Sequence, residues 1–328
     1  MSDHYSSEKK TFYNTPPTAS LHRRAVLRSL TKMYLQRRLF LPPTLLPIIK
    51  PNWSHFIDSS YSNKYIWLGH SSLMLRLQDQ TIMIDPVLAS YAAPVPFVAP
   101  RYQAAPIQWN ELPSVDTVIY SHNHYDHLDR AALKYFALSD TRFFVPLGLG
   151  RYLKNKGIAE SRITECDWWQ HVEYKGIHYH AVPARHYSGR SLFDRNHSLW
   201  AGWVLQQGSE QLYYSGDSAF PGYFSEIAER FKSFDLAFIE NGQYDAAWPD
   251  NHMTPVETIK AASIVKAKRF MPVHWGAYLL APHAWDEPVR QSIPLAKSKG
   301  ISTLTPLQGQ VFDKNSETDE WWLNLKRR

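Results

Sequence analysis

The sequence predicts an α/β protein in which two β-sheets pack together and helices cover their outer faces. Its 328 residues are 44% hydrophobic and 20% charged, as in ordinary globular proteins, which leaves enough apolar residues for a sizeable core. After residue 60, short apolar runs bounded by turn residues come first in hairpin-like series and later alternate with helical patterns. This order is typical of two packed sheets with outer helices. The absence of repeats excludes collagen-like and solenoid chains.

The expected elements follow from local pattern. Strands are expected at residues 64–69, 72–77, 81–85, 116–120, 142–146, 177–183, 199–205, 211–217, 235–240 and 269–274. Helices are expected at about 129–138, 148–156, 222–231, 255–266 and 286–299.

A further helix is expected in the basic N-terminal segment, at residues 21–41, followed by a Pro-rich connector at 41–51. Apolar and basic side chains fall roughly on opposite faces of this helix, but the separation is imperfect. Two interpretations therefore remain open: a helix that lies on an anionic membrane surface, or a helix that packs on the domain. We divide the chain into this N-terminal segment and connector, 1–59, and a catalytic domain, 60–328.

The net charge of +6 belongs to the N-terminal segment. Residues 1–50 hold nine Lys/Arg and two Asp/Glu, whereas the remainder of the chain holds 27 Lys/Arg and 28 Asp/Glu. A main domain near neutrality lacks the basic stripe of a nucleic-acid platform, so no nucleic-acid partner is expected. The sequence is compatible with a homodimer.

Compartment is predicted from the cysteine content and the apolar runs. The single cysteine, Cys166, cannot form an intrachain disulfide, and the first ten residues carry no apolar signal-peptide region. The longest apolar stretch, 39–49, is interrupted by prolines and is shorter than a spanning helix. We expect a cytoplasmic protein. Under the first of the two interpretations above, residues 21–41 would contact the inner membrane face.

The strongest chemical signal is the run SHNHYDHLD at 121–129, directly after an apolar strand pattern. Burying unpaired imidazoles and carboxylates costs about 1–3 kcal/mol each, and binding a metal ion removes that cost. Imidazole together with carboxylate suits Zn²⁺, which keeps an open coordination position for water in catalytic sites. Further candidate ligands, His186, Asp217 and His274, each follow another expected strand.

These motifs resemble the metallo-β-lactamase fold, an αββα four-layer sandwich with a metal cleft at one edge. The closer resemblance is to N-acyl-phosphatidylethanolamine-hydrolysing phospholipase D and its bacterial relatives, over about residues 60–310. It rests on YIWLGH, IDP, SHNHYDHLD, FVPLGL, DWW, RSLFDRN, LWAGW, SGDS and HWGAY, in this order.

The resemblance implies a dinuclear zinc centre. One ion would be held by His122, His124 and His186, and the other by Asp126, His127 and His274, with Asp217 bridging the two. A glutamate at position 124 would have suggested the di-iron branch of this fold, so His124 favours zinc and hydrolysis.

The expected reaction is phosphodiester cleavage of an N-acylated or related phospholipid by a metal-bound hydroxide. The residues expected to act in the chemical step are Asp126, Asp217 and His252, with His252 near the leaving group. The alternative is a lactonase or another carbonyl hydrolase on the same metal site, because fold alone does not fix the substrate.

Outside the ligands, three residues are candidates for a supporting role. Asp85 and Asp129 are expected to accept imidazole N–H bonds, or instead to form an Asp-Pro turn and a helix cap, and His70 is a weaker candidate. Among the other histidines, five are interpreted as structural or exposed: His171, His178, His180, His197 and His283.

Overall fold

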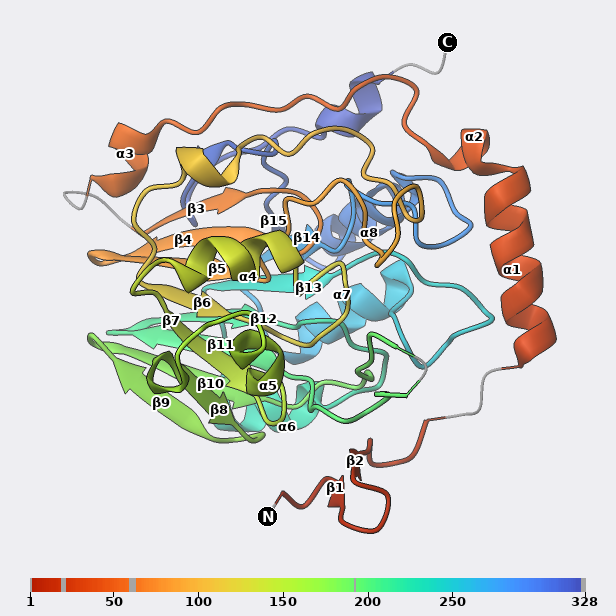
Figure 1. Cartoon of the computed structure of the whole chain (residues 1–328). Helices are drawn as coiled ribbons and strands as arrows, with labels where there is room; N and C mark the ends of the chain where they lie inside the picture. The colour runs from red at the N-terminus through yellow and green to blue at the C-terminus, as the bar shows by residue number, and fades with distance from the viewer. Residues whose placement is uncertain (1, 19–21, 59–62, 192, 326–328) are drawn as a thin grey trace.

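The computed structural model describes residues 2–18, 22–58, 63–191 and 193–325. Two seven-stranded sheets lie face to face, and helices flank them (Figure 1). The first sheet has the order β16 (Val311–Phe312), β3 (Lys64–Trp67), β4 (Leu73–Leu77), β5 (Gln80–Ile84), β6 (Thr117–Ile119), β7 (Arg142–Pro146) and β8 (Ile163–Cys166). The second has the order β15 (Ser302–Thr303), β14 (Arg269–Val273), β13 (Leu236–Glu240), β12 (Glu210–Tyr214), β11 (Gly202–Gln207), β10 (Ile177–Val182) and β9 (His171–Tyr174).

Each sheet combines an antiparallel part with a parallel part. In the first sheet, neighbouring strands run antiparallel from β16 to β5 and parallel from β5 to β8. In the second, they run antiparallel from β9 to β12 and parallel from β12 to β15. The parallel strands need crossover connections. The sequence predicts helices in all of these connections except the one between β5 and β6, where the only helical element among the described residues is the 3₁₀ turn Trp109–Glu111.

Strand side chains alternate between two apolar layers. Tyr65 and Trp67 face the core between the sheets, whereas Ile66 and Leu68 face the helices outside the first sheet. The outer helices contribute Leu133 and other apolar side chains to that second layer. The helices are α1 (Arg23–Leu35), α2 (Arg37–Phe40), α3 (Trp53–Ile57), α4 (Arg130–Ala137), α5 (Gly150–Lys154), α6 (Phe224–Phe231), α7 (Pro255–Ile264) and α8 (Glu287–Ser298), with 3₁₀ turns at Trp109–Glu111, Glu160–Arg162 and Trp321–Asn324. The predicted αββα sandwich is confirmed.

The N-terminal region differs from its prediction in detail. The helix expected at 21–41 is two helices, α1 and α2, separated at Gln36, and residue 21 lies outside the described residues. Before them lies a short hairpin of β1 (Tyr5–Ser6) and β2 (Thr11–Phe12). Phe12 and Leu46 are buried in the core between the sheets, so parts of the segment 1–59 pack on the main domain. The boundary itself, at residues 59–62, lies outside the described residues.

Pattern reasoning missed the strands at the margins of the sheets. Neither β8 nor β9 was predicted, because these edge strands are short and carry polar residues that blur the alternation expected of a strand. No described helix is long and apolar enough to span a membrane.

Candidate metal centre

The predicted metal ligands gather where strands of both sheets end. His122, His124, Asp126 and His127 follow β6, the parallel neighbour of β5 in the first sheet. From the second sheet, His186 follows β10, Asp217 follows β12 and His274 directly follows β14. The two sheets therefore supply opposite walls of one site.

The first ligand group comprises His122, His124 and His186. His124 Nδ1 lies 2.9 Å from His122 Nε2 and 3.2 Å from His186 Nε2. Burial lowers the pKa of His124 to about 4. All three rings have a lowered pKa, with burial as the main cause, so each ring is neutral at neutral pH and keeps one nitrogen lone pair free for a metal.

The second group comprises Asp126, His127 and His274. Asp126 Oδ2 lies 3.5 Å from His127 Nε2 and 3.3 Å from His274 Nε2. His274 has a φ of +67°, a left-handed conformation that costs about 1–3 kcal/mol in a residue other than glycine and is held here by its surroundings. Burial lowers the pKa of His274, but the neighbouring carboxylates of Asp217 and Asp126 outweigh it and raise the value to about 10. A cation bound here would replace that proton.

Asp217 lies between the two groups. Its Oδ2 atom is 3.7 Å from both His122 Nε2 and His186 Nε2, and 3.1 Å from both His127 Nε2 and His274 Nε2. One buried carboxylate oxygen thus faces imidazoles of both groups, as a bridging ligand would.

The residues fit a pair of tetrahedral metal ions. Four ligands at about 2.0 Å from a tetrahedral ion lie about 3.3 Å from one another, close to the separations found here. Among the described residues, buried atoms His127 Nε2, His274 Nε2 and Asp217 Oδ1 make no hydrogen bond of good geometry. Buried polar atoms without partners are costly, and metal ions would satisfy these.

The ring nitrogens on the far side of several ligands are held by hydrogen bonds. His127 Nδ1 lies 2.7 Å from Asp85 Oδ2, and His186 Nδ1 lies 3.0 Å from the carbonyl of Asn251. Asp85 also accepts from the Tyr214 hydroxyl at 2.6 Å and from the Ser121 amide at 2.7 Å. Such partners fix which nitrogen of the ring faces the metal.

The other two supporting candidates behave differently. His70 Nε2 lies 2.9 Å from Asp126 Oδ2, so His70 contacts a predicted ligand and belongs to one of the groups able to hold an ion. Asp129 instead caps α4 by accepting from the amide of Ala131 at 2.8 Å, which is the alternative interpretation of that residue.

His252 lies beside the centre and reveals a partner that sequence reasoning missed. Its Nδ1 lies 2.9 Å from Glu240 Oε2, and its ring stacks on that of His274 with a centroid distance of 4.8 Å. Glu240 is completely buried at the end of β13, and this burial raises its pKa above the ordinary value. The sequence feature that could have indicated Glu240 is its position at the end of the apolar strand pattern 235–240.

A pocket of about 340 Å³ opens in front of the metal centre. Three predicted ligands, His124, Asp126 and Asp217, line it together with His252. Its apolar wall includes Val26 and Leu30 of α1, with Ala92, Trp248 and Leu280. A segment predicted to lie outside the catalytic domain therefore forms part of the pocket.

Comparison with known proteins agrees with this fold. The beta-lactamase superfamily domain matches residues 80–275. An uncharacterised protein of Mycobacterium tuberculosis is 35% identical over 288 residues, which are 86% of this chain and 77% of that one. N-acyl-phosphatidylethanolamine-hydrolysing phospholipase D 1 of Caenorhabditis elegans is 36% identical over 225 residues, 65% of this chain and 63% of that one.

Among solved structures, the metallo hydrolase Igni18 of Ignicoccus hospitalis superposes with a TM-score of 0.60 at 16% identity. The superposition covers 77% of this chain and 99% of Igni18. At this low sequence identity, the similarity shows the fold alone. The chain is a member of the β-lactamase superfamily and has the metallo-β-lactamase fold.

Proposed function

We propose that this protein is a dinuclear zinc hydrolase that cleaves a phosphodiester, with an N-acylated or related phospholipid as its substrate. The observation that carries the dinuclear part is the position of Asp217 Oδ2, within 3.1–3.7 Å of four imidazoles from two ligand groups. The substrate class is supported by the similarity to the phospholipase D of Caenorhabditis elegans.

The charges at the site suit an anionic substrate. Asp126 and Asp217 are the carboxylates among the predicted ligands, and together they offset only half of the four positive charges of two zinc ions. When bound, such ions lower the pKa of water to near 7 and stabilise negative charge that develops on phosphoryl oxygens. A net-positive, largely buried centre attracts a phosphodiester more strongly than a neutral ester.

His252 is placed to handle the leaving-group proton. Its Nδ1 lies 2.9 Å from Glu240 Oε2, so Nε2 is the ring nitrogen left for the pocket that His252 lines. An alkoxide leaving group needs a proton, and a positioned imidazole supplies one. Glu240 keeps the ring oriented.

The apolar wall of the pocket suits a lipid chain near the scissile bond. Val26, Leu30, Trp248 and Leu280 provide this wall without a charged group. The pocket is too small for a whole phospholipid, so we infer that the head group enters while the rest of the lipid stays outside.

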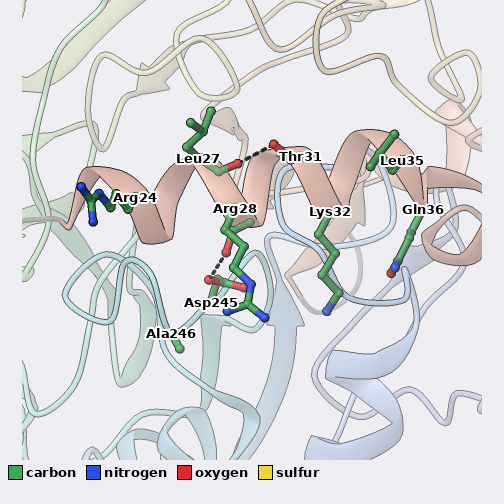
Figure 2. A pocket seen from close by; sticks show the side chains of 10 residues that line it. Arg24, Leu27, Arg28, Thr31, Lys32, Leu35, Gln36, Asp245 and Ala246 are labelled. Atoms are coloured by element: carbon green, nitrogen blue, oxygen red, sulfur yellow. Dashed lines mark hydrogen bonds between the residues drawn. The ribbon is translucent and has the colours of Figure 1, made fainter.

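We infer further that α1 and α2 contact an anionic membrane. Figure 2 shows Arg24, Arg28 and Lys32 along α1, where they border a groove of about 860 Å³ beside Asp245 and Ala246. Large apolar side chains on the same two helices are exposed: Leu27, Tyr34, Leu35 and Leu39. Exposed apolar residues next to basic ones are typical of helices that lie in a membrane interface.

The function is tested by direct product analysis. Zinc-loaded protein is incubated with N-acyl-phosphatidylethanolamine in mixed micelles and, separately, with a long-chain acyl lactone, and products are identified by mass spectrometry. We expect phosphatidic acid from the wild type and from Asp140→Asn, an exposed carboxylate remote from the ligand set, but not from Asp217→Asn. Rapid lactone opening without release of phosphatidic acid would contradict the proposal.

A further inference from the structure

Arg190 lies behind the metal centre and reaches the turn that carries the first ligands. Its Nη1 donates to the carbonyl oxygens of Asn123 and Leu128, both at 2.7 Å, and lies 3.3 Å from that of His124. A cationic donor forms stronger hydrogen bonds with carbonyls than a neutral one does. One guanidinium therefore binds the backbone on both sides of the ligands His124, Asp126 and His127.

The contact between the two segments is reciprocal. The Arg190 guanidinium stacks on the Tyr125 ring, 3.8 Å from its centroid, and the Tyr125 hydroxyl donates to the Arg190 carbonyl at 3.2 Å. Next to Arg190, the amide of Gly189 donates to Asn123 Oδ1 at 2.7 Å. Several groups from each segment thus hold the other in place.

These two segments come from different sheets. The turn 122–128 follows β6 of the first sheet, whereas the loop 185–198, which we call the His186 loop, follows β10 of the second. The first ligand group combines His122 and His124 from the turn with His186 from the loop. The three ligand nitrogens of this group stay close together only if the turn and the His186 loop keep their relative positions.

We propose that Arg190 is a positioning residue that fastens the His186 loop to the metal-binding turn and so sets the affinity of one of the two metal sites. The inference rests on the proposed dinuclear centre. The second group is less dependent on Arg190. Its ligand His274 comes from neither segment, and the two ligands in the turn are also held by other side chains, His127 by Asp85 and Asp126 by His70. Loss of Arg190 should therefore affect the two sites unequally.

Asn14 holds the same loop from its other side. Its Nδ2 donates to the His186 carbonyl at 2.7 Å, and the side chain is 4% exposed. The adjoining N-terminal residues support this contact, because Arg185 Nη1 donates to the Pro16 carbonyl at 2.7 Å. Asn14 therefore offers an independent second variant that acts on His186 without touching Arg190.

The experiment measures metal affinity rather than turnover. Full-length protein loaded with Co²⁺ is titrated with a competing chelator, and the two dissociation constants and the visible absorption spectrum are recorded. We expect Arg190→Met to weaken one site by about 10–100-fold, the usual effect of losing an outer partner of a ligand, and to change the spectrum of that site alone. Arg190→Lys should restore part of the loss, because it keeps the charge but not the planar fork. Asn14→Ala should weaken the same site to a smaller extent.

Arg130→Met is the matched control. Arg130 also lies over the Tyr125 ring, at 5.4 Å, and donates to its hydroxyl at 3.2 Å, but it is exposed, and no hydrogen bond from it to a carbonyl of the turn is found among the described residues. We expect this variant to keep both affinities. Unchanged affinities in Arg190→Met, or equal weakening of both sites, would overturn the positioning role. A wild-type protein that binds a single Co²⁺ would instead contradict the dinuclear centre, before any variant is compared.

Discussion

The pocket has two walls of very different construction. The wall of metal ligands is built from buried side chains that contact one another at 2.9–3.7 Å and are fixed from behind, as by Asp85. The apolar wall includes α1, which has no buried residue. A hydrogen bond from Ser29 Oγ to Asp245 Oδ1, at 2.8 Å, joins this helix to the rest of the protein. Its apolar contact is made by Ala25 and Val26 against Ala247, Trp248 and Ala281.

This difference suggests that the ligand wall and α1 have different roles in the pocket. Chemistry requires ligands fixed within fractions of an ångström, and the ends of two sheets provide such fixation. An isolated helix of 13 residues is marginally stable in water, so α1 depends on what it packs against. We therefore expect substitutions in the ligand wall to abolish activity, and substitutions in α1 to shift affinity and substrate preference.

The largest effect is expected from Asp217→Asn. An amide cannot bridge two cations as a carboxylate does, and loss of outer partners alone costs about 10–100-fold, so turnover should fall by at least about 10³-fold. Metal analysis after dialysis should show at least one site depleted. Near-normal turnover with a full metal complement would remove Asp217 from the centre.

A smaller and selective effect is expected from His252→Gln. Hydrolysis of an alkyl phosphodiester should slow by about 10²-fold or more, because its leaving group needs a proton, whereas an aryl phosphodiester should be affected much less. Glu240→Gln should act in the same direction through the ring it holds. Both variants should retain their metal. Equal losses on the two substrates would reduce His252 to a binding role.

Metal removal should destabilise the ligand wall. Ligands from both sheets meet at the centre, so metal binding stabilises the folded arrangement of the sheets. At a free metal concentration of 100 times the dissociation constant, one bound ion stabilises the folded state by about 2.7 kcal/mol. We expect chelation to lower the Tm by several degrees, measured by calorimetry, and added zinc to restore it. An unchanged Tm after verified metal removal would show that the centre contributes nothing to folding.

The smallest effects are expected in α1, where two leucines provide a matched pair. Leu30 lines the metal pocket, whereas Leu27, 66% exposed, borders the outer groove. Leu30→Ala should raise the KM for a long-chain substrate by roughly fivefold, as expected for about 1 kcal/mol of lost apolar contact. Leu27→Ala should leave that KM unchanged and weaken binding to anionic vesicles. If Leu27→Ala raised the KM and Leu30→Ala weakened vesicle binding, Leu27 rather than Leu30 would face the substrate.

The basic residues of α1 give a related test of the membrane contact. Each contributes on the order of 1 kcal/mol near an anionic surface, within a Debye length. Replacing Arg24, Arg28 and Lys32 by Gln should reduce sedimentation with anionic vesicles, and high salt should have the same effect on the wild type. Equal binding by both proteins at low salt would favour a purely structural helix.

Residues of one type with a clear chemical signal are brought together by the structure, while their role as metal ligands stays a prediction. His122, His124 and Asp126 stand in a run that few cores tolerate, and His274 directly follows an apolar strand, so their convergence could be predicted. The resemblance to known hydrolases predicted the αββα sandwich fold. The alternation of core and outer side chains in the strands supported it.

Other features depend on contacts between distant parts of the chain. The contact of Arg190 with the turn 122–128 spans more than sixty residues, and that of Asn14 with His186 spans 172. Asn14 lies in no motif, and the motif RSLFDRN, which begins at Arg190, does not indicate the contact with the turn. Glu240 was missed because a buried glutamate reads as the polar end of a strand until His252 is seen beside it.

The most direct measurement is anomalous diffraction at the zinc absorption edge from crystals grown with zinc. We predict two peaks flanking the Asp217 carboxylate, one among His122, His124 and His186, the other among Asp126, His127 and His274. Other groups of side chains near the centre are also close enough to hold an ion, including Asp217, Glu240, His252 and His274. A single peak, or a peak at that group in place of the predicted pair, would contradict the dinuclear centre bridged by Asp217.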